Sequence, residues 1–288
     1  MISRIKSILR HLRLFRPDRR PVTPDWPTLS QSRPWRVEQK HLMAFLENCP
    51  GWDNHALLPP TYPQVVAVDL HLRLLGDARF PYQPMGLVHI SNRIELVSPM
   101  PVDQTYRLCA RLKPGGEHPR GALVVIETML YAGDDLVWRS QAIALKITRD
   151  KTANESDTRE LDQGPDLSAD RGLDLPEDLG RRYARIAGDL NPIHQRAWMA
   201  RPFGFEHPIL HGMWTLAWAI QPLPEIRGQQ NVSVDVEFVR PVSLPGRAYV
   251  GFAPMQDGLR EGRLWSREAN KPSLRLQITR RMTFSEVP

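Results

Sequence analysis

The sequence predicts an α+β protein in which one unit, helices followed by antiparallel strands, occurs twice. In each half of the 288 residues, helical periodicity precedes a series of Val-, Ile- and Leu-rich runs that are separated by Pro, Gly and Asp turns. In addition, residues 94–99 (IELVSP) match residues 236–241 (VEFVRP) without a gap, at an offset of 142 residues. A unit of this kind buries its helix against a curved sheet.

The N-terminal unit begins with a helical period at 37–49. After the Pro-rich turn at 58–63 comes a second apolar helix at 64–75. The Val-, Ile- and Leu-rich runs that follow predict four strands, at 87–97, 103–113, 121–132 and 136–148.

The C-terminal unit repeats this order after a polar stretch at 149–172, which is typical of a linker. Helices are predicted at 176–187 and at about 212–220, and strands at 231–239, 246–255, 261–268 and 273–284. Trp198, Trp214 and Trp218 are expected in the core. We therefore expect four parts: a tail at 1–30, an N-terminal domain at 31–150, a linker at 151–172 and a C-terminal domain at 173–288.

The charge of the chain is concentrated at one end. The formal net charge is +6, and the first twenty residues carry seven Lys and Arg against one Asp, so the remaining residues hold 31 charges of each sign. A neutral body lacks the basic face that a nucleic-acid-binding fold needs, and no nucleic-acid partner is expected.

The basic tail has the pattern of an amphipathic helix, because apolar residues recur at three- and four-residue steps over residues 2–16 and arginines lie between them. Three uses stay open: peripheral contact with an anionic membrane, a mitochondrial presequence within residues 1–20, and packing against the body or a partner. With a presequence the protein would act in the mitochondrial matrix; otherwise a cytoplasmic location is expected.

Other composition features exclude several classes. The two cysteines, Cys49 and Cys109, form no CxxC pair and no Cys/His cluster at zinc spacing, so neither a disulfide scaffold nor a zinc site is expected. No apolar run approaches the length of a membrane span. Because no Gly-rich dinucleotide loop or P-loop occurs, no NAD or nucleotide is expected. No cofactor and no metal are predicted.

One segment has the residues of a reaction centre. GDLNPIH, from Gly188 to His194, is followed 17 residues later by His211-Gly-Met. Gly188 and Pro192 bend the chain, so Asp189 and His194 can reach one water molecule and act as an acid/base pair. Asn191 can hold the loop through side-chain to backbone hydrogen bonds. Gly212 starts an apolar helix, where unpaired N–H groups suit an oxygen that gains negative charge.

This pattern resembles the (R)-specific enoyl-thioester hydratase motif of the MaoC-like dehydratases, a family with the hotdog fold. The resemblance covers residues 172–288 directly and the N-terminal half through the repeat; Pro202, Phe203 and Pro208 add to it. Family members of this length are similar to a double hotdog, in which the N-terminal copy lacks the catalytic motif and helps to shape the acyl-chain site. The resemblance implies a hydro-lyase of fatty-acid metabolism that adds water to trans-2-enoyl thioesters or removes it from (R)-3-hydroxyacyl thioesters.

The resemblance also implies the roles of individual residues. Asp189 and His194 would form the catalytic dyad, and the backbone amide of Gly212 would polarise the thioester carbonyl. Asn191, Gly188 and His211 would support them. Which member of the dyad is the primary base stays open.

The partners and two alternative functions also stay open at this point. The substrate would be an acyl thioester of CoA or of acyl carrier protein, and a homodimer is considered. One alternative is a hotdog acyl thioesterase, against which the Asn-Pro-x-His continuation argues. The other is a non-catalytic acyl-binding protein that is tethered by its tail.

Overall fold

The computed structural model describes residues 26–84, 86–148, 167–266 and 271–280. The basic tail at 1–20 and most of the predicted linker lie outside these ranges, and the boundaries of the four predicted parts stay predictions. Within the described ranges no helix is long and apolar enough to cross a membrane.

The N-terminal half carries three helices and five strands in the described residues. They are β1 (Ser30–Arg36), α2 (Gln39–Asn48), α3 (Tyr62–Val66), α4 (Val68–Leu75), β2 (Leu87–Leu96), β3 (Thr105–His118), β4 (Gly121–Ala132) and β5 (Asp135–Ile147).

The C-terminal half follows the same plan, with additional short helices before its long apolar helix. Its elements are β6 (Arg171–Leu175), α5 (Leu179–Ala187), the 3-10 turn η4 (Pro192–His194), α6 (Ala197–Ala200), η5 (Arg201–Phe203), α7 (Gly212–Ile220), α8 (Pro224–Arg227), β7 (Val232–Phe238), β8 (Gly246–Phe252), β9 (Leu259–Trp265) and β10 (Leu274–Arg280).

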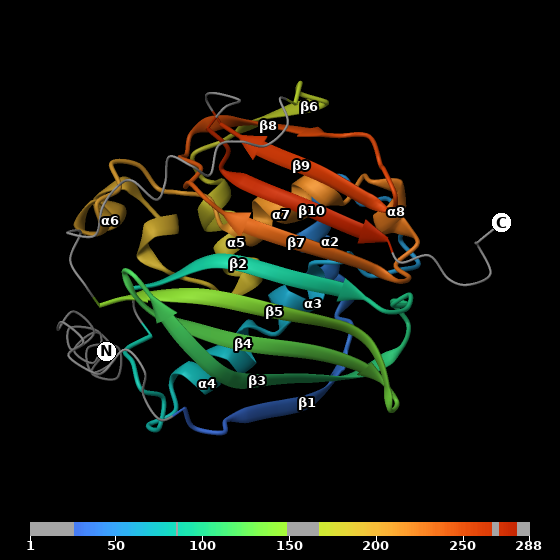
Figure 1. The fold of residues 1–288 in the computed structure, drawn as a ribbon, viewed down its shortest axis with the longest axis horizontal. Helices are drawn as coiled ribbons and strands as arrows, with labels where there is room; N and C mark the ends of the chain where they lie inside the picture. Colours follow the sequence, from blue (N-terminus) through green and yellow to red (C-terminus); the bar gives the residue numbers. More distant parts are fainter. Residues whose placement is uncertain (1–25, 85, 149–166, 267–270, 281–288) are drawn as a thin grey trace.

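All ten of these strands form one antiparallel sheet, in the order β1-β3-β4-β5-β2-β7-β10-β9-β8-β6. The order is symmetric: replacing β1, β3, β4, β5 and β2 by β6, β8, β9, β10 and β7 turns one half into the other. Figure 1 shows α7, α5, α2, α3 and α4 behind this sheet, with β2 and β7 at its centre. The predicted α+β class and the repetition of one unit are confirmed.

The two halves meet at β2 and β7, which pair antiparallel. The register places Arg93 opposite Asp235. Because the offset of 142 residues maps Arg93 onto Asp235, these two residues lie at the centre of the internal symmetry. The guanidinium Nη1 of Arg93 donates to Asp235 Oδ1 at 3.1 Å.

The apolar helix α7 is enclosed on all sides. Every residue from Trp214 to Ile220 is buried, as expected for a helix that is apolar around its whole circumference. The indole Nε1–H of Trp214 donates to the carbonyl oxygen of Asn48, at the end of α2, at 2.7 Å. This hydrogen bond ties the helix of the C-terminal half to the N-terminal half.

Three local features differ from the sequence predictions. The edge strands β1 and β6 were not predicted. The helix expected at 64–75 is divided at Ala67 into α3 and α4. Trp214 and Trp218 are buried, whereas Trp198 is 68% exposed because α6 is a single turn outside the helix layer, so its predicted core position was wrong.

Candidate active site

The segment from Gly188 to His194 is a tight turn held by its own side chains. Helix α5 ends at Ala187, and the next residue, Gly188, reverses the chain with a left-handed φ of 71°. Asp189 Oδ1 accepts from the Asn191 N–H at 3.2 Å, and Asn191 Oδ1 accepts from the Ile193 N–H at 3.4 Å. The sequence predicted this role of Asn191, whose side chain caps η4.

His194 ends η4 and is buried. Its Nδ1 lies 2.7 Å from the carbonyl oxygen of Ile209. Because a carbonyl oxygen only accepts, we assign the proton to Nδ1, which leaves Nε2 as an acceptor. Burial lowers the pKa of His194 below its usual value, although Asp189 and the hydrogen bond to Ile209 act in the opposite direction. A neutral imidazole with a free Nε2 is a competent base.

Gly180 sets how closely α5 approaches this histidine. A Cβ at position 180 would lie 2.5 Å from the carbonyl oxygen of His194, which is closer than van der Waals contact permits. Only glycine fits here without displacing the turn at Gly188–His194. Gly180 was not predicted as a site residue. The local signal is a glycine in the first turn of a helix, where it lowers helix propensity.

His211 is the residue before α7 and is buried between the other site residues. Its ring stacks on His194, with centroids 3.6 Å apart and planes at 25°, and its Nε2 lies 3.3 Å from the backbone oxygen of Asp189. Burial, followed by the neighbouring His194, lowers the pKa of His211 well below its usual value. The approach of His211 Nε2 to the Asp189 carboxylate at 3.9 Å is therefore not an ion pair.

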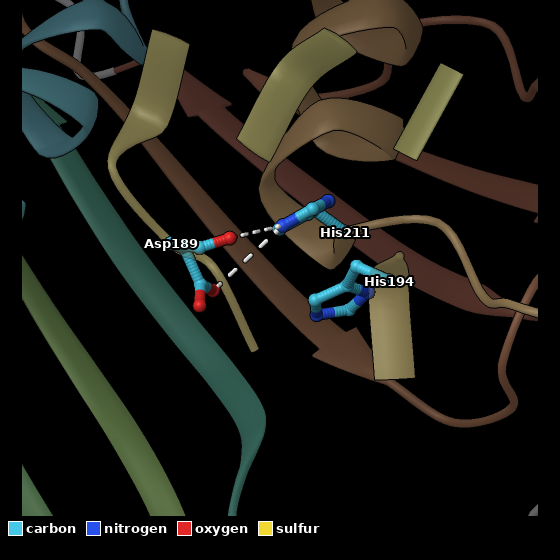
Figure 2. Close-up of side chains that lie close together, drawn as sticks. All are labelled: Asp189, His194 and His211. Carbon is cyan, nitrogen blue, oxygen red and sulfur yellow. Dashed lines mark hydrogen bonds and ion pairs between the residues drawn. The ribbon is translucent and has the colours of Figure 1, made fainter. Parts of the chain in front are cut away.

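Figure 2 shows how Asp189, His194 and His211 come together. One polar atom from each lies within 4.8 Å of the others, and the Asp189 side chain is 46% exposed. Two histidines and a carboxylate are also a donor set for a metal. Here one nitrogen of each ring already has a backbone partner, because His194 Nδ1 lies 2.7 Å from the Ile209 carbonyl oxygen and His211 Nε2 lies 3.3 Å from that of Asp189. This geometry favours acid–base chemistry on a water molecule.

Gly212 is the first residue of α7. A side chain does not fit at this position. A Cβ there would lie 2.6 Å from the ring of Phe238 on β7. Among the described residues no backbone hydrogen bond uses the Gly212 N–H. At the first turn of a helix such a group is free to bind a ligand, and the helix dipole favours a negatively charged one.

A cleft of about 340 Å³ between the two halves reaches Gly188. The N-terminal half contributes Tyr62 and Val68 to its lining, and α5 contributes Arg185. His41 bridges the halves there, with Nδ1 2.8 Å from the Tyr62 hydroxyl and Nε2 2.9 Å from the Ile186 carbonyl oxygen. No local pattern pointed to His41, because its partners are distant in the chain.

All six predicted site residues thus lie around the start of α7. Gly188, Asp189, Asn191 and His194 form one turn, and His211 and Gly212 form the helix start that faces it. Their roles in a reaction stay predictions.

Sequence comparisons identify relatives of this chain. The family described as "MaoC like domain" matches residues 154–257. The 3-hydroxyacyl-thioester dehydratase X of Mycobacterium tuberculosis is 32% identical over 192 residues, which cover 66% of this chain and 68% of that protein. A probable enoyl-CoA hydratase 2 of Dictyostelium discoideum is 26% identical over 188 residues, which cover 62% of each protein.

Comparisons with solved structures identify the same family of relatives. The crystal structure of the M. tuberculosis dehydratase HtdX superposes with a TM-score of 0.73 at 27% identity, covering 88% of this chain and 99% of that one. Another M. tuberculosis protein, described as having a double hotdog fold, gives a TM-score of 0.55 at 12% identity over 91% of this chain and 99% of its own, which supports the fold alone. The fold is a double hotdog, and the chain belongs to the family of MaoC-like dehydratases.

Proposed function

We propose that this protein is a hydro-lyase that hydrates trans-2-enoyl thioesters to (R)-3-hydroxyacyl thioesters and catalyses the reverse dehydration in fatty-acid metabolism. The observation that carries the proposal is the neutral His194, with Nε2 free, beside the half-exposed carboxylate of Asp189. The relatives named 3-hydroxyacyl-thioester dehydratase and enoyl-CoA hydratase support this reaction. The (R) configuration follows from the family motif.

In the hydration direction, His194 acts as the base. Its Nε2 takes one proton from a water molecule while the water oxygen bonds to C3 of the substrate. The electron pair of the C2=C3 bond moves toward the thioester carbonyl. Asp189 accepts a hydrogen bond from the second water proton, which stays on the new hydroxyl group. The protonated Nε2 then delivers its proton to C2, so His194 and Asp189 both end as they began.

The carbonyl oxygen of the thioester gains negative charge during this step. We place it at the N–H of Gly212, where the helix start provides an unpaired donor and a favourable dipole. His211 keeps Asp189 and His194 at their separation through its stacking and its hydrogen bond.

The test is hydration of enoyl-CoA substrates of several chain lengths by the purified chain, followed by the loss of enoyl absorbance. We expect Asp189→Asn and His194→Gln each to lower kcat by about 10²- to 10⁴-fold. The exposed His207→Gln is the control and should match the wild type, because its side chain is 52% exposed and lies outside the site.

Two other outcomes would contradict the proposal. Release of free CoA without a 3-hydroxyacyl product would indicate a thioesterase. Binding of acyl-CoA without turnover, equal in wild type and Asp189→Asn, would indicate an acyl-binding protein. Chiral analysis of the product tests the (R) configuration. A homodimer, the CoA or acyl-carrier-protein form of the substrate, the cytoplasmic or mitochondrial location and membrane contact through residues 2–16 stay predictions.

A further inference from the structure

Asn92, on β2 of the N-terminal half, is a buried polar residue with poor hydrogen bonding. It is 2% exposed, and its Oδ1 has no partner among the described residues. Its Nδ2 lies 3.5 Å from the sulfur of Met213, and a thioether is a weak acceptor. Burying an amide in this state costs free energy. At the equivalent position of the C-terminal half, 142 residues on, the fully buried Val234 fills the same kind of site. The sheet itself therefore does not require an amide here.

The contacts of β2 place Asn92 beside the start of α7. Met213 directly follows Gly212 in the chain. The Phe238 ring, which occupies the space where a Gly212 side chain would be, lies against His89 with centroids 4.8 Å apart. His89 is three residues before Asn92, and the bulge in β2 between His89 and Ser91 places both residues on the same face, opposite Ala144 and Ala142 of β5. The inner face of β2 thus borders the helix start at two points.

We propose that Asn92 is a catalytic residue supplied by the N-terminal half, whose side-chain amide donates a second hydrogen bond to the thioester carbonyl oxygen beside the N–H of Gly212. This inference rests on the proposed function. When substrate binds, the Nδ2–H exchanges the sulfur of Met213 for an oxygen that gains negative charge as water adds at C3. A buried donor directed at that oxygen stabilises the transition state more than the ground state.

The first test is Asn92→Leu, which keeps the approximate volume and removes the amide. We expect kcat for enoyl-CoA hydration to fall about 10²-fold, KM to change less than threefold, and Tm to stay equal or rise, because an unsatisfied buried polar group is lost. The control is Thr128→Val in the same half. Thr128 is fully buried and its hydroxyl lies 2.8 Å from His71 Nε2. This variant should lose Tm and keep kcat within threefold.

The second test is Asn92→Asp. An ionised carboxylate cannot donate, whereas its protonated form can, and burial raises a carboxyl pKa. The ratio of its kcat to that of the wild type should therefore rise as pH falls from 8 to 6.

Two results would overturn the inference. One is an Asn92→Leu variant with kcat within threefold of the wild type. The other is a kcat loss accompanied by a Tm loss as large as that of Thr128→Val, which would show a structural role. An inactive wild type would instead refute the proposed function, so the two failures are distinguishable.

Discussion

The site residues that could be predicted from the sequence are those whose partners are close to them in the chain. Asp189, Asn191 and His194 were predicted because their geometry is local: nested turns within seven residues bring them together. His211 and Gly212 were also predicted, because they follow the GDLNPIH segment at the spacing of the motif. Gly180, His41 and Asn92 were not predicted, because their importance depends on a carbonyl, a tyrosine or a methionine that is distant in the chain.

His71 and His89 of the N-terminal half are half-buried, and their ionisation affects the stability of the protein. Burial lowers the pKa of His71 to about 4, with His89 beside it acting in the same direction, and burial lowers the pKa of His89 to about 4. Their folded-state pKa values lie below the unfolded value of about 6.5. Between these limits the unfolded chain binds more protons, so stability falls as pH falls from about 6.5 to about 4.

We therefore expect Tm to decrease between pH 7 and pH 5. The free energy of unfolding should fall by at most about 1.4 kcal/mol per pH unit for each histidine. His71→Gln, which can still bond Thr128, should show a weaker pH dependence. The exposed His207→Gln should follow the wild type. Parallel curves of Tm against pH for His71→Gln and the wild type would contradict this account.

At the scale of elements, strands and helices with strong apolar periodicity were predicted and the edges of the sheet were not. β1 contains Pro34 and shows mostly exposed and half-buried residues. β6 begins within the polar stretch that was assigned to the linker. An edge strand has one neighbour, so it needs little apolar surface and tolerates proline. Such strands arise from pairing with β3 and β8, which no local pattern records.

The packing of α5 on the turn at Gly188–His194 gives a prediction at this scale. Gly180→Ala places a Cβ 2.5 Å from the His194 carbonyl oxygen, so helix and turn must separate. We expect Tm to fall by several degrees and kcat to fall at least tenfold, because sub-ångström displacement of a base slows proton transfer. Gly228→Ala is the matched control, since nothing lies within 4 Å of its Cβ position and its φ is −73°. Equal effects of both substitutions would refute the steric explanation.

At the scale of the whole molecule, the charges around the β2–β7 junction are symmetric except at its centre. Glu95 is paired with Arg139 across β2 and β5, and Glu237 is opposite Arg275 across β7 and β10. These positions carry the same charge in both halves. The central pair, Arg93 and Asp235, carries opposite charges instead. Two identical units would place like charges opposite each other there.

Charge reversal tests this arrangement. Arg93→Asp and Asp235→Arg each put like charges at the centre, and each should lower Tm by about 2 °C, the scale of an exposed ion pair. The double substitution is the mirror image of the native pattern, because the arginine introduced on β7 then lies beside Glu237 as Arg93 lies beside Glu95. It should recover most of the lost Tm. Additive losses in the double variant, measured by thermal unfolding, would refute the coupling.

The symmetric order of the ten strands has a consequence for stoichiometry. The GDLNPIH sequence occurs once in the chain, although the sheet offers two equivalent places for it. A dimer of identical single units would have two reaction centres, which would bind substrate and convert it in the same way. In this chain the N-terminal half does not carry the motif, so its residues can change without altering a second reaction centre. Calorimetric titration with a substrate analogue should accordingly reach saturation at one molecule per chain.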